Sequence, residues 1–268
     1  MKFTYLKTLF LFISLITSGC ASVSGPGDPN DPLESYNRAA FEFNDNFDRY
    51  LLKPVAKGYD AITPDPVMKG INNFFSNLDD IIVIFNDLLQ LKPLQFLSDT
   101  GRFIINTTLG IGGFIDWASD MNMPKHNEDF GQTLGYWGVP EGPYLVIPFW
   151  GPSTIRDGAG LLVDSTQFDP IWQELENGFP VDHRDRKLSW GLTAAKTVDI
   201  RASFLKAEKI LDEAALDRYT FIREVYLQRR LNQVHDGKPP EEAVEFSEDE
   251  LFDFDEPEKP AEKPAKTE

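Results

Sequence analysis

The amino-acid sequence predicts a mainly α-helical protein with irregular, glycine-rich connections between its helices. Apolar residues recur every three or four positions through long segments, which is the repeat of one helix face. Glycine and proline cluster between these segments, and regularly spaced strands with alternating polarity are not apparent. Beyond residue 20, no window approaches the roughly 20 apolar residues that a membrane-crossing helix needs. If the protein enters lipid, we expect it to do so without a conventional span.

Residues 1–19 have the features of a bacterial export signal. Two lysines precede a short apolar run at 9–16, and small residues follow it. Cys20, the only cysteine of the chain, comes directly after Ser-Gly and resembles the cysteine of a lipobox, whose thiol is acylated and becomes the mature N-terminus. Thr17 departs from that pattern, because a lipobox prefers leucine there. The alternative is an ordinary cleaved signal with an incidental cysteine, and a lone cysteine forms no intramolecular disulfide in either case.

Lipidation at Cys20 predicts a protein that is firmly anchored to a membrane. Two or more acyl chains hold a protein on a bilayer, whereas a single chain binds only marginally. Ala21 follows the cysteine, at a position where an inner-membrane retention signal usually has aspartate. We therefore expect residues 20–32, which are rich in glycine, proline and serine, to form a lipidated tether on the periplasmic side of the outer membrane.

A helical domain is predicted over residues 33–235. Its first periodic segment begins at Leu33 and is interrupted by Pro54, which predicts a break or kink. A second helical segment covers 65–93. Its part at 81–91 is apolar almost all round, so we expect this part to be completely buried.

Further helical patterns follow in the second half of the domain. A third helix is expected over 94–109, and the glycine cluster "GIGG" ends it. Residues 160–178 and 186–202 favour additional helices.

The last periodic pattern, at 200–231, permits either one kinked helix or two helices. As one helix it would be about 48 Å long, because each residue adds 1.5 Å. Arg229 and Arg230 stand near its end, where cationic side chains suit the negative end of the helix dipole.

The most apolar and aromatic stretch, residues 134–160, is also the richest in turn-forming residues. It reads "LGYWGVPEGPYLVIPFWGPSTIRDGAG". Glycine lets a backbone bend sharply, and tyrosine and tryptophan suit a boundary between lipid and water. Irregular backbone at membrane depth is tolerated only where it is buried in protein or lines a cavity. The stretch therefore predicts either a wall along which lipid passes or a hairpin packed into its own core.

The charge distribution argues against nucleic acid as a partner. The chain has a net charge of −17, with 13 acidic residues against 4 lysines from residue 236 onward, and no basic stripe that could neutralise phosphates. Residues 236–268 are acidic and proline-punctuated, which predicts a disordered tail. This tail is either merely solvated or a segment that docks on a basic partner. The residues that would dock are Phe246, Leu251, Phe252 and Phe254.

Motifs for catalysis, cofactors and metals are missing from the sequence. The three histidines are far apart, no serine stands in a GxSxG elbow, and no glycine-rich nucleotide motif occurs. Asp79 and Asp80 could pair as catalytic carboxylates, but adjacent acids on an exposed helix turn are far commoner, and we expect that arrangement. We therefore expect a protein that is not an enzyme, has no cofactor and no metal, and acts physically through its apolar surface.

Four sequence blocks resemble the successive signatures of the MlaA/VacJ lipoproteins. They occur in the family's order, and the resemblance covers roughly residues 31–235. The third block is the most specific. The blocks are "DPLESYNRAAFEFND" (31–45), "RFIINTTLGIGGFIDWA" (102–118), "FGQTLGYWGVPEGPYLVIPFWGPSTIRD" (130–157) and "YTFIREVYLQRR" (219–230).

The resemblance implies a ring-shaped, helical, monotopic lipoprotein embedded in the inner leaflet of the outer membrane. Such a protein has a central amphipathic channel and a glycine-rich hairpin loop, and it associates with trimeric porins. It removes phospholipids that are misplaced in the outer leaflet and passes them to a soluble periplasmic carrier, MlaC. A porin-associated scaffold that conducts no lipid is one alternative, and a lipid hydrolase with an unrecognised site is another.

The resemblance also assigns residues to the expected channel. It implies that the helix carrying Phe41, Phe43, Asn44 and Phe47 borders the channel. It places Gly138, Gly142 and Tyr144 in the hairpin loop that shapes or gates the passage. Pro140 and Glu141 would occupy the middle of that loop and stiffen it.

Overall fold

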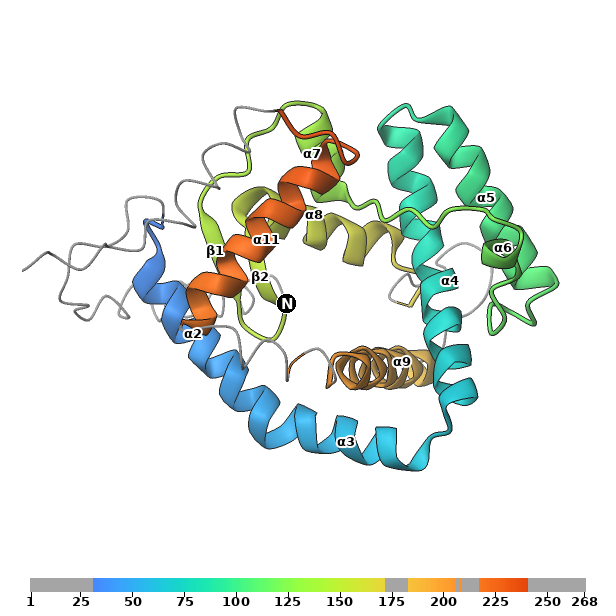
Figure 1. Cartoon of the computed structure of the whole chain (residues 1–268), viewed down its shortest axis with the longest axis horizontal. Helices are drawn as coiled ribbons and strands as arrows, with labels where there is room; N and C mark the ends of the chain where they lie inside the picture. Colours follow the sequence, from blue (N-terminus) through green and yellow to red (C-terminus); the bar gives the residue numbers. More distant parts are fainter. Residues whose placement is uncertain (1–30, 172–182, 206–207, 209–216, 241–268) are drawn as a thin grey trace, which may run out of the picture.

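The helices are arranged as a ring (Figure 1). The computed structural model describes residues 31–171, 183–205, 208 and 217–240. The expected signal, Cys20, most of the tether and the four apolar tail residues lie outside these ranges. Within them, helices dominate and one short β-hairpin is present, which confirms the mainly α-helical prediction.

The first side of the ring is a bent helical rod. Helix α2 (Glu34–Phe47) passes through a π-helical turn (Asp48–Leu52) into α3 (Lys53–Ile62). Pro54 has no N–H to donate to the preceding turn, so one backbone hydrogen bond of the helix is missing there. The wider π turn accommodates the proline, and the helical rod continues without a break. The expected kink is therefore present, but the helix resumes at once.

Helices α4 (Asp65–Leu89) and α5 (Pro93–Thr108) form the opposite side as an antiparallel pair. The turn that follows α5 leads to the short helix α6 (Trp117–Asp120). Glycine is required in this turn because a Cβ on Gly110 would lie 2.1 Å from the carbonyl oxygen of Ile115. The expected end of the third helix at "GIGG" is confirmed.

The glycine-rich stretch folds as a hairpin between two helices. Helix α7 (Phe130–Tyr136) leads to strands β1 (Tyr144–Ile147) and β2 (Gly151–Thr154), which pair antiparallel. Helix α8 (Ile155–Val163) and a π-helical turn (Asp164–Phe168) follow.

Two details of this stretch matter for the expected loop. A Cβ on Gly160 would lie 2.3 Å from the backbone nitrogen of Gly131, so glycine lets α7 and α8 cross in contact. Pro140 and Glu141 lie between α7 and β1 and not in the hairpin turn, which corrects the expectation that they stiffen the middle of the hairpin.

The last pattern, at 200–231, is not one continuous helix. Helix α9 (His183–Ser203) and helix α11 (Arg218–Val234) are separate, and Figure 1 shows that they point in different directions. A single helix over the whole pattern is thereby excluded, because α9 ends at Ser203 and α11 begins at Arg218.

Many interior residues of the ring are polar, and many large apolar side chains face outward. Val83 is the single buried apolar residue at 81–91, where Asn86, Asp87 and Gln90 are also buried, so the predicted complete burial of that segment is wrong. Leu91, Leu94 and Leu97 are between 64% and 83% exposed. A polar group without a hydrogen-bond partner is costly in hydrocarbon, whereas an apolar side chain is not. Buried polar residues together with exposed apolar residues therefore suit a protein that is surrounded by hydrocarbon.

Buried charges hold α4 and α5 to their neighbours. Asp80 is 1% exposed and pairs with Lys125, so the expectation of two acids on an exposed helix turn is wrong for Asp80. Arg102 of α5 is likewise buried, and it donates hydrogen bonds to Asp116 and to the carbonyl of Met123. Among the described residues, no helix is both long enough and apolar enough to cross a bilayer.

Candidate functional site

Two asparagines on one face of α2 hold the outer edge of the hairpin. They are seven residues apart, which is close to two helical turns. The amide of Asn37 donates to the carbonyl of Tyr144 at 3.0 Å and accepts from the N–H of Val146 at 2.8 Å. Asn37 thus replaces the missing neighbour strand at this point of β1.

Asn44 repeats this pairing at the tip of the hairpin. Its amide donates to the carbonyl of Ile147 at 3.1 Å and accepts from the N–H of Phe149 at 2.7 Å. Phe149 has a φ of 69°, a left-handed conformation that bulky residues adopt rarely. Its ring is packed edge-on between Phe43 and Phe47, with centroids 5.1 Å away in both cases. The structure therefore brings these three sequence-predicted residues of α2 together at the hairpin tip.

The other sequence-predicted residues lie elsewhere. Phe41 and Tyr144 belong to an aromatic core with Tyr219, and Tyr144 is 3% exposed. Gly138 and Gly142 lie in the connection between α7 and β1, and both have positive φ angles. The seven residues therefore divide among a hairpin tip, a buried core and a connecting loop.

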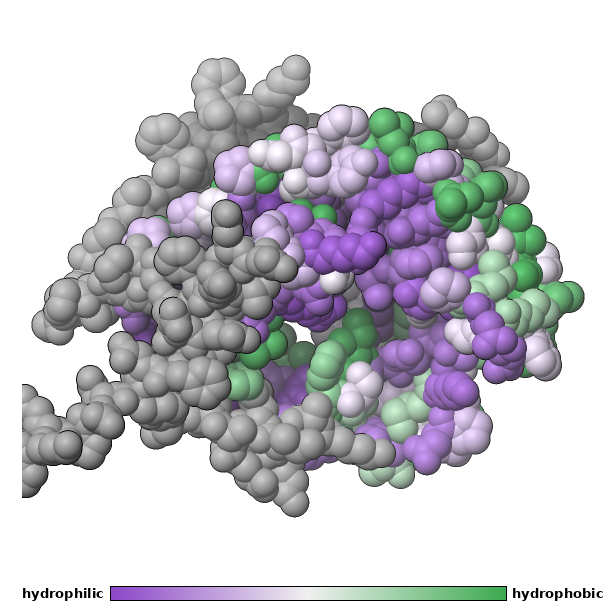
Figure 2. Space-filling view, turned by 45° about the horizontal axis from the view of Figure 1, so that its top comes forward, coloured by the Kyte–Doolittle hydropathy of each residue, from purple (hydrophilic) through white to green (hydrophobic). Residues whose placement is uncertain are grey.

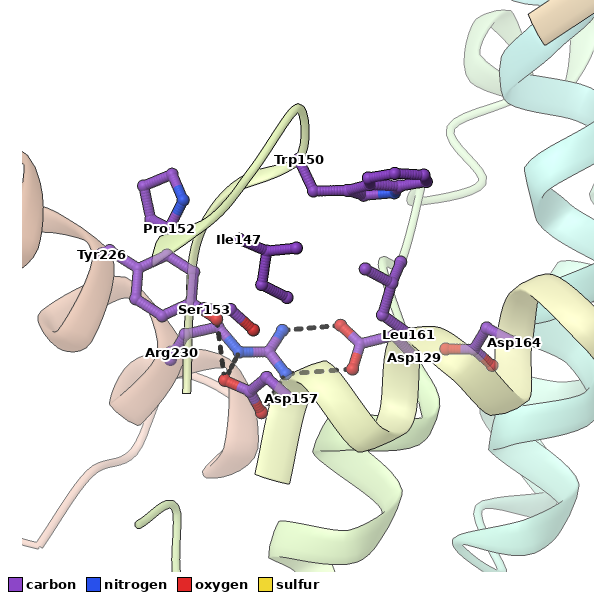
Figure 3. Close-up of a pocket in the computed structure, with 10 residues that line it drawn as sticks. All are labelled: Asp129, Ile147, Trp150, Pro152, Ser153, Asp157, Leu161, Asp164, Tyr226 and Arg230. Atoms are coloured by element: carbon purple, nitrogen blue, oxygen red, sulfur yellow. Dashed lines mark hydrogen bonds and ion pairs between the residues drawn. The ribbon is translucent and has the colours of Figure 1, made fainter. Parts of the chain in front are cut away.

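A cavity of about 260 Å³ opens beside the hairpin, between β1, β2, α7, α8 and α11 (Figure 3). Its two sides differ in character. Trp150, Ile147, Pro152 and Leu161 supply an apolar side, and Figure 3 shows the Trp150 ring extended across it. The polar side is formed by Asp129, Ser153, Asp157, Asp164, Tyr226 and Arg230.

Arg230 lies at the centre of the polar side and ties three helices together. It makes a two-point ion pair with Asp129 (2.6 and 2.9 Å) and another with Asp157 (2.9 Å for both contacts). Asp129 caps the start of α7 and Asp157 lies in the first turn of α8, while Arg230 comes from α11. Burial alone would raise the pKa values of both carboxyls, but the hydrogen bonds and charge of Arg230 outweigh it and lower them.

This network was missed by sequence reasoning, which assigned Arg230 to the helix dipole. Arg230 is buried and fully paired with carboxylates, so that interpretation is wrong for it, whereas its neighbour Arg229 is exposed. The available signal was the charged pair Arg156-Asp157 within the most apolar stretch of the chain.

A second buried polar cluster joins α4 to α5. Asp87 and Asp99 are both 0% exposed, and within the described part of the chain neither oxygen of Asp87 has a hydrogen-bond donor. Burial, and then the neighbouring Asp99 carboxyl, raise the pKa of Asp87. The two carboxyls can bond to each other only when one holds a proton, so we assign a shared proton to this pair. His126 contacts the other side of Asp99 at 2.8 Å.

The surface combines an apolar exterior with a central hollow. Figure 2 shows hydrophobic residues gathered over the α4–α5 side of the ring, and a hollow near the middle of the molecule with both hydrophilic and hydrophobic residues around it. In the described ranges, no group of three or more potential ligands is arranged to hold a metal ion.

Comparisons with known proteins agree with this architecture. Residues 29–233 match the family described as "MlaA lipoprotein". The chain is 35% identical to the "Intermembrane phospholipid transport system lipoprotein MlaA" of Haemophilus influenzae, over 94% of this chain and 98% of that protein. It is 36% identical to the protein of the same name from Escherichia coli K12, over 93% and 98% of the two chains.

A solved structure has the same fold. It was described under "Structural basis for maintenance of bacterial outer membrane lipid asymmetry", and it superposes with a TM-score of 0.63 at 33% identity. The match covers 75% of this chain and 96% of that one. The family match and the relatives therefore agree with the sequence blocks and with the helical ring: the chain belongs to the MlaA lipoprotein family.

Proposed function

We propose that this protein removes phospholipids mislocalised in the outer leaflet of the outer membrane and passes them through its amphipathic centre to a periplasmic lipid carrier. The protein works physically, as a conduit, without catalysis. Its relatives from H. influenzae and E. coli carry the name of an intermembrane phospholipid transport system, which supports this assignment.

The observation that carries the proposal is the exposed apolar exterior combined with a polar interior. Leu88, Leu94 and Leu97 are exposed while Asp87 and Asp99 of the same two helices are buried. A phospholipid that leaves a bilayer exposes acyl chains at a cost of about 0.8 kcal/mol per CH₂, on the order of 20 kcal/mol in total. A path between compartments must therefore shelter the tails beside apolar side chains while the headgroup remains in polar surroundings. The cavity in Figure 3 offers both kinds of surface within about 260 Å³.

The same proposal includes the anchor and the partners. Acylated Cys20 holds the protein on the periplasmic side of the outer membrane, the protein associates there with trimeric porins, and the carrier MlaC receives the lipid. The tail segment around Phe252 is the proposed docking element for the carrier. Docking at the tail is a separate proposal, so its failure would leave the conduction proposal standing.

The test is lipid transfer by the purified protein. The full chain, reconstituted in vesicles with labelled phospholipid, should deliver intact lipid to added carrier. Phe43→Asp should reduce transfer more than it reduces thermal stability, because Phe43 is exposed beside the hairpin tip. Porin association without transfer would instead favour the scaffold alternative, and release of lysolipid would favour a hydrolase.

A further inference from the structure

The cavity beside the hairpin contains a buried carboxylate that lacks a cationic partner. Asp164 is 6% exposed and lines the cavity. Its oxygens accept hydrogen bonds from the side-chain amide of Asn86 at 3.1 Å and from the backbone N–H of Phe130 at 2.8 Å. Both donors are neutral, and no described lysine or arginine forms an ion pair with Asp164.

Asp164 has unused capacity to accept hydrogen bonds. A carboxylate offers about four lone-pair sites, and these two donors occupy two of them. Burial raises the pKa of Asp164 to about 6, the bonds from Phe130 and Asn86 oppose this, and the more distant charges of Asp129 and Arg230 act in opposite directions. At neutral pH the group is therefore mostly ionised, in a place where a charge without a partner is costly.

The other charges of the cavity are already matched. All five N–H groups of Arg230 are used, in its contacts with Asp129, Asp157 and Gln233. Among the residues that line the cavity, Arg230 is the one cation against three carboxylates. An incoming anionic group finds no free donor on Arg230 and meets an excess of negative charge.

The size and the apolar side of the cavity indicate which part of a lipid fits. A volume of about 260 Å³ corresponds to roughly nine water molecules at about 30 Å³ each, which suits a small headgroup and not two acyl chains. Trp150 and Ile147 lie above the polar groups, so tails can continue along the hairpin while the headgroup remains below (Figure 3).

We propose that this cavity selects phospholipids whose headgroup carries a primary ammonium, with Asp164 as the counter-ion, over phospholipids with an anionic headgroup. Phosphatidylethanolamine is the corresponding class, and phosphatidylglycerol is the disfavoured one. The inference rests on the proposed function, because it names the headgroup preference of the same lipid path.

The test measures the composition of bound lipid. The full-length protein in detergent is equilibrated with mixed micelles of phosphatidylethanolamine and phosphatidylglycerol, equimolar and with identical acyl chains, and the lipid that remains after gel filtration is counted by mass spectrometry. We expect the wild type to enrich phosphatidylethanolamine at least about fivefold over the input ratio. Asp164→Asn should bring the ratio of the two bound lipids close to the input ratio. Asp120→Asn, which removes an exposed acid on α6, should behave as the wild type.

The outcomes separate the two proposals. Bound lipid at the input ratio in the wild type overturns the headgroup preference and leaves lipid transport standing. A preference that persists in Asp164→Asn overturns the role of Asp164. A wild-type protein that binds neither lipid overturns the proposed function together with this inference. If Asp164→Asn fails to fold, the wild-type ratio alone still decides whether the preference exists.

Discussion

Replacing Asn37 by alanine should loosen the hairpin more than any other single change on α2. Asn37 is 0% exposed and makes three hydrogen bonds, to the carbonyl of Tyr144, to the N–H of Val146 and to Asp31. Each such bond contributes about 1 kcal/mol net, and a buried partner left unsatisfied adds to the loss. We therefore expect Asn37→Ala to lower the free energy of unfolding by about 3 kcal/mol.

The hydrogen-exchange rate of the Val146 amide measures how far this substitution destabilises the hairpin itself. A loss of about 3 kcal/mol corresponds to roughly a hundredfold faster exchange, because 1.4 kcal/mol is a factor of ten. The free energy of unfolding of the whole protein is measured by chemical unfolding in detergent, with tryptophan fluorescence as the signal. Asn44→Ala should accelerate exchange at the Phe149 amide with a smaller global effect, because Asn44 is partly exposed and water can replace its bonds.

Asn46→Ala is the matched control, because Asn46 is exposed on the same helix, and it should change stability by less than about 0.5 kcal/mol. If Asn37→Ala behaves like Asn46→Ala in both measurements, the asparagine pairing does not hold the hairpin.

Three further changes test other parts of the structure. Cys20→Ala should remove the acyl chains and so make the protein easier to extract from the membrane fraction, with a loss of lipid transfer, and a variant that is extracted no more easily than the wild type would contradict the anchor. Arg230→Met should destabilise the protein by about 3 kcal/mol in chemical unfolding, because Asp129 loses its cation and buried Asp157 keeps only its contact with Arg156. Exposed Arg229→Met should have little effect, and equal effects would refute the network. The free energy of unfolding should fall as pH rises above the ordinary carboxyl range, because the folded protein keeps a proton on Asp87 that the unfolded chain releases. Asp87→Asn should flatten this dependence, and an unchanged slope would refute the shared proton.

Local patterns in the sequence were sufficient for the long helices, whereas the hairpin was only one of two alternatives and was implied by the family resemblance. Periodicity located α4 and α5, and "GIGG" marked the end of α5, because these signals act within a few residues. Periodicity also shows which side chains share a helix face, but not which medium that face meets. For this reason the apolar run at 81–91 was expected inside the protein, although Leu88 is exposed and Asn86 is buried.

The polar network of the cavity depends on contacts between distant parts of the chain. Arg230 lies 73 residues from Asp157 and 101 residues from Asp129, and no local signal connects them. The asparagines of α2 are a similar case. Asn44 was singled out through the family resemblance, whereas Asn37, which is more deeply buried, was not.

The side-chain amides along β1 have a consequence for how other proteins can approach the hairpin. A two-stranded sheet has two open edges, and an exposed edge is a template on which an extended peptide can add as a further strand. Asn37 and Asn44 occupy two carbonyls and two N–H groups of β1 and of the turn that follows it, between Tyr144 and Phe149. Strand addition is therefore blocked along this edge, and any protein that engages the hairpin there must recognise side chains such as the Phe149 ring, not main-chain groups.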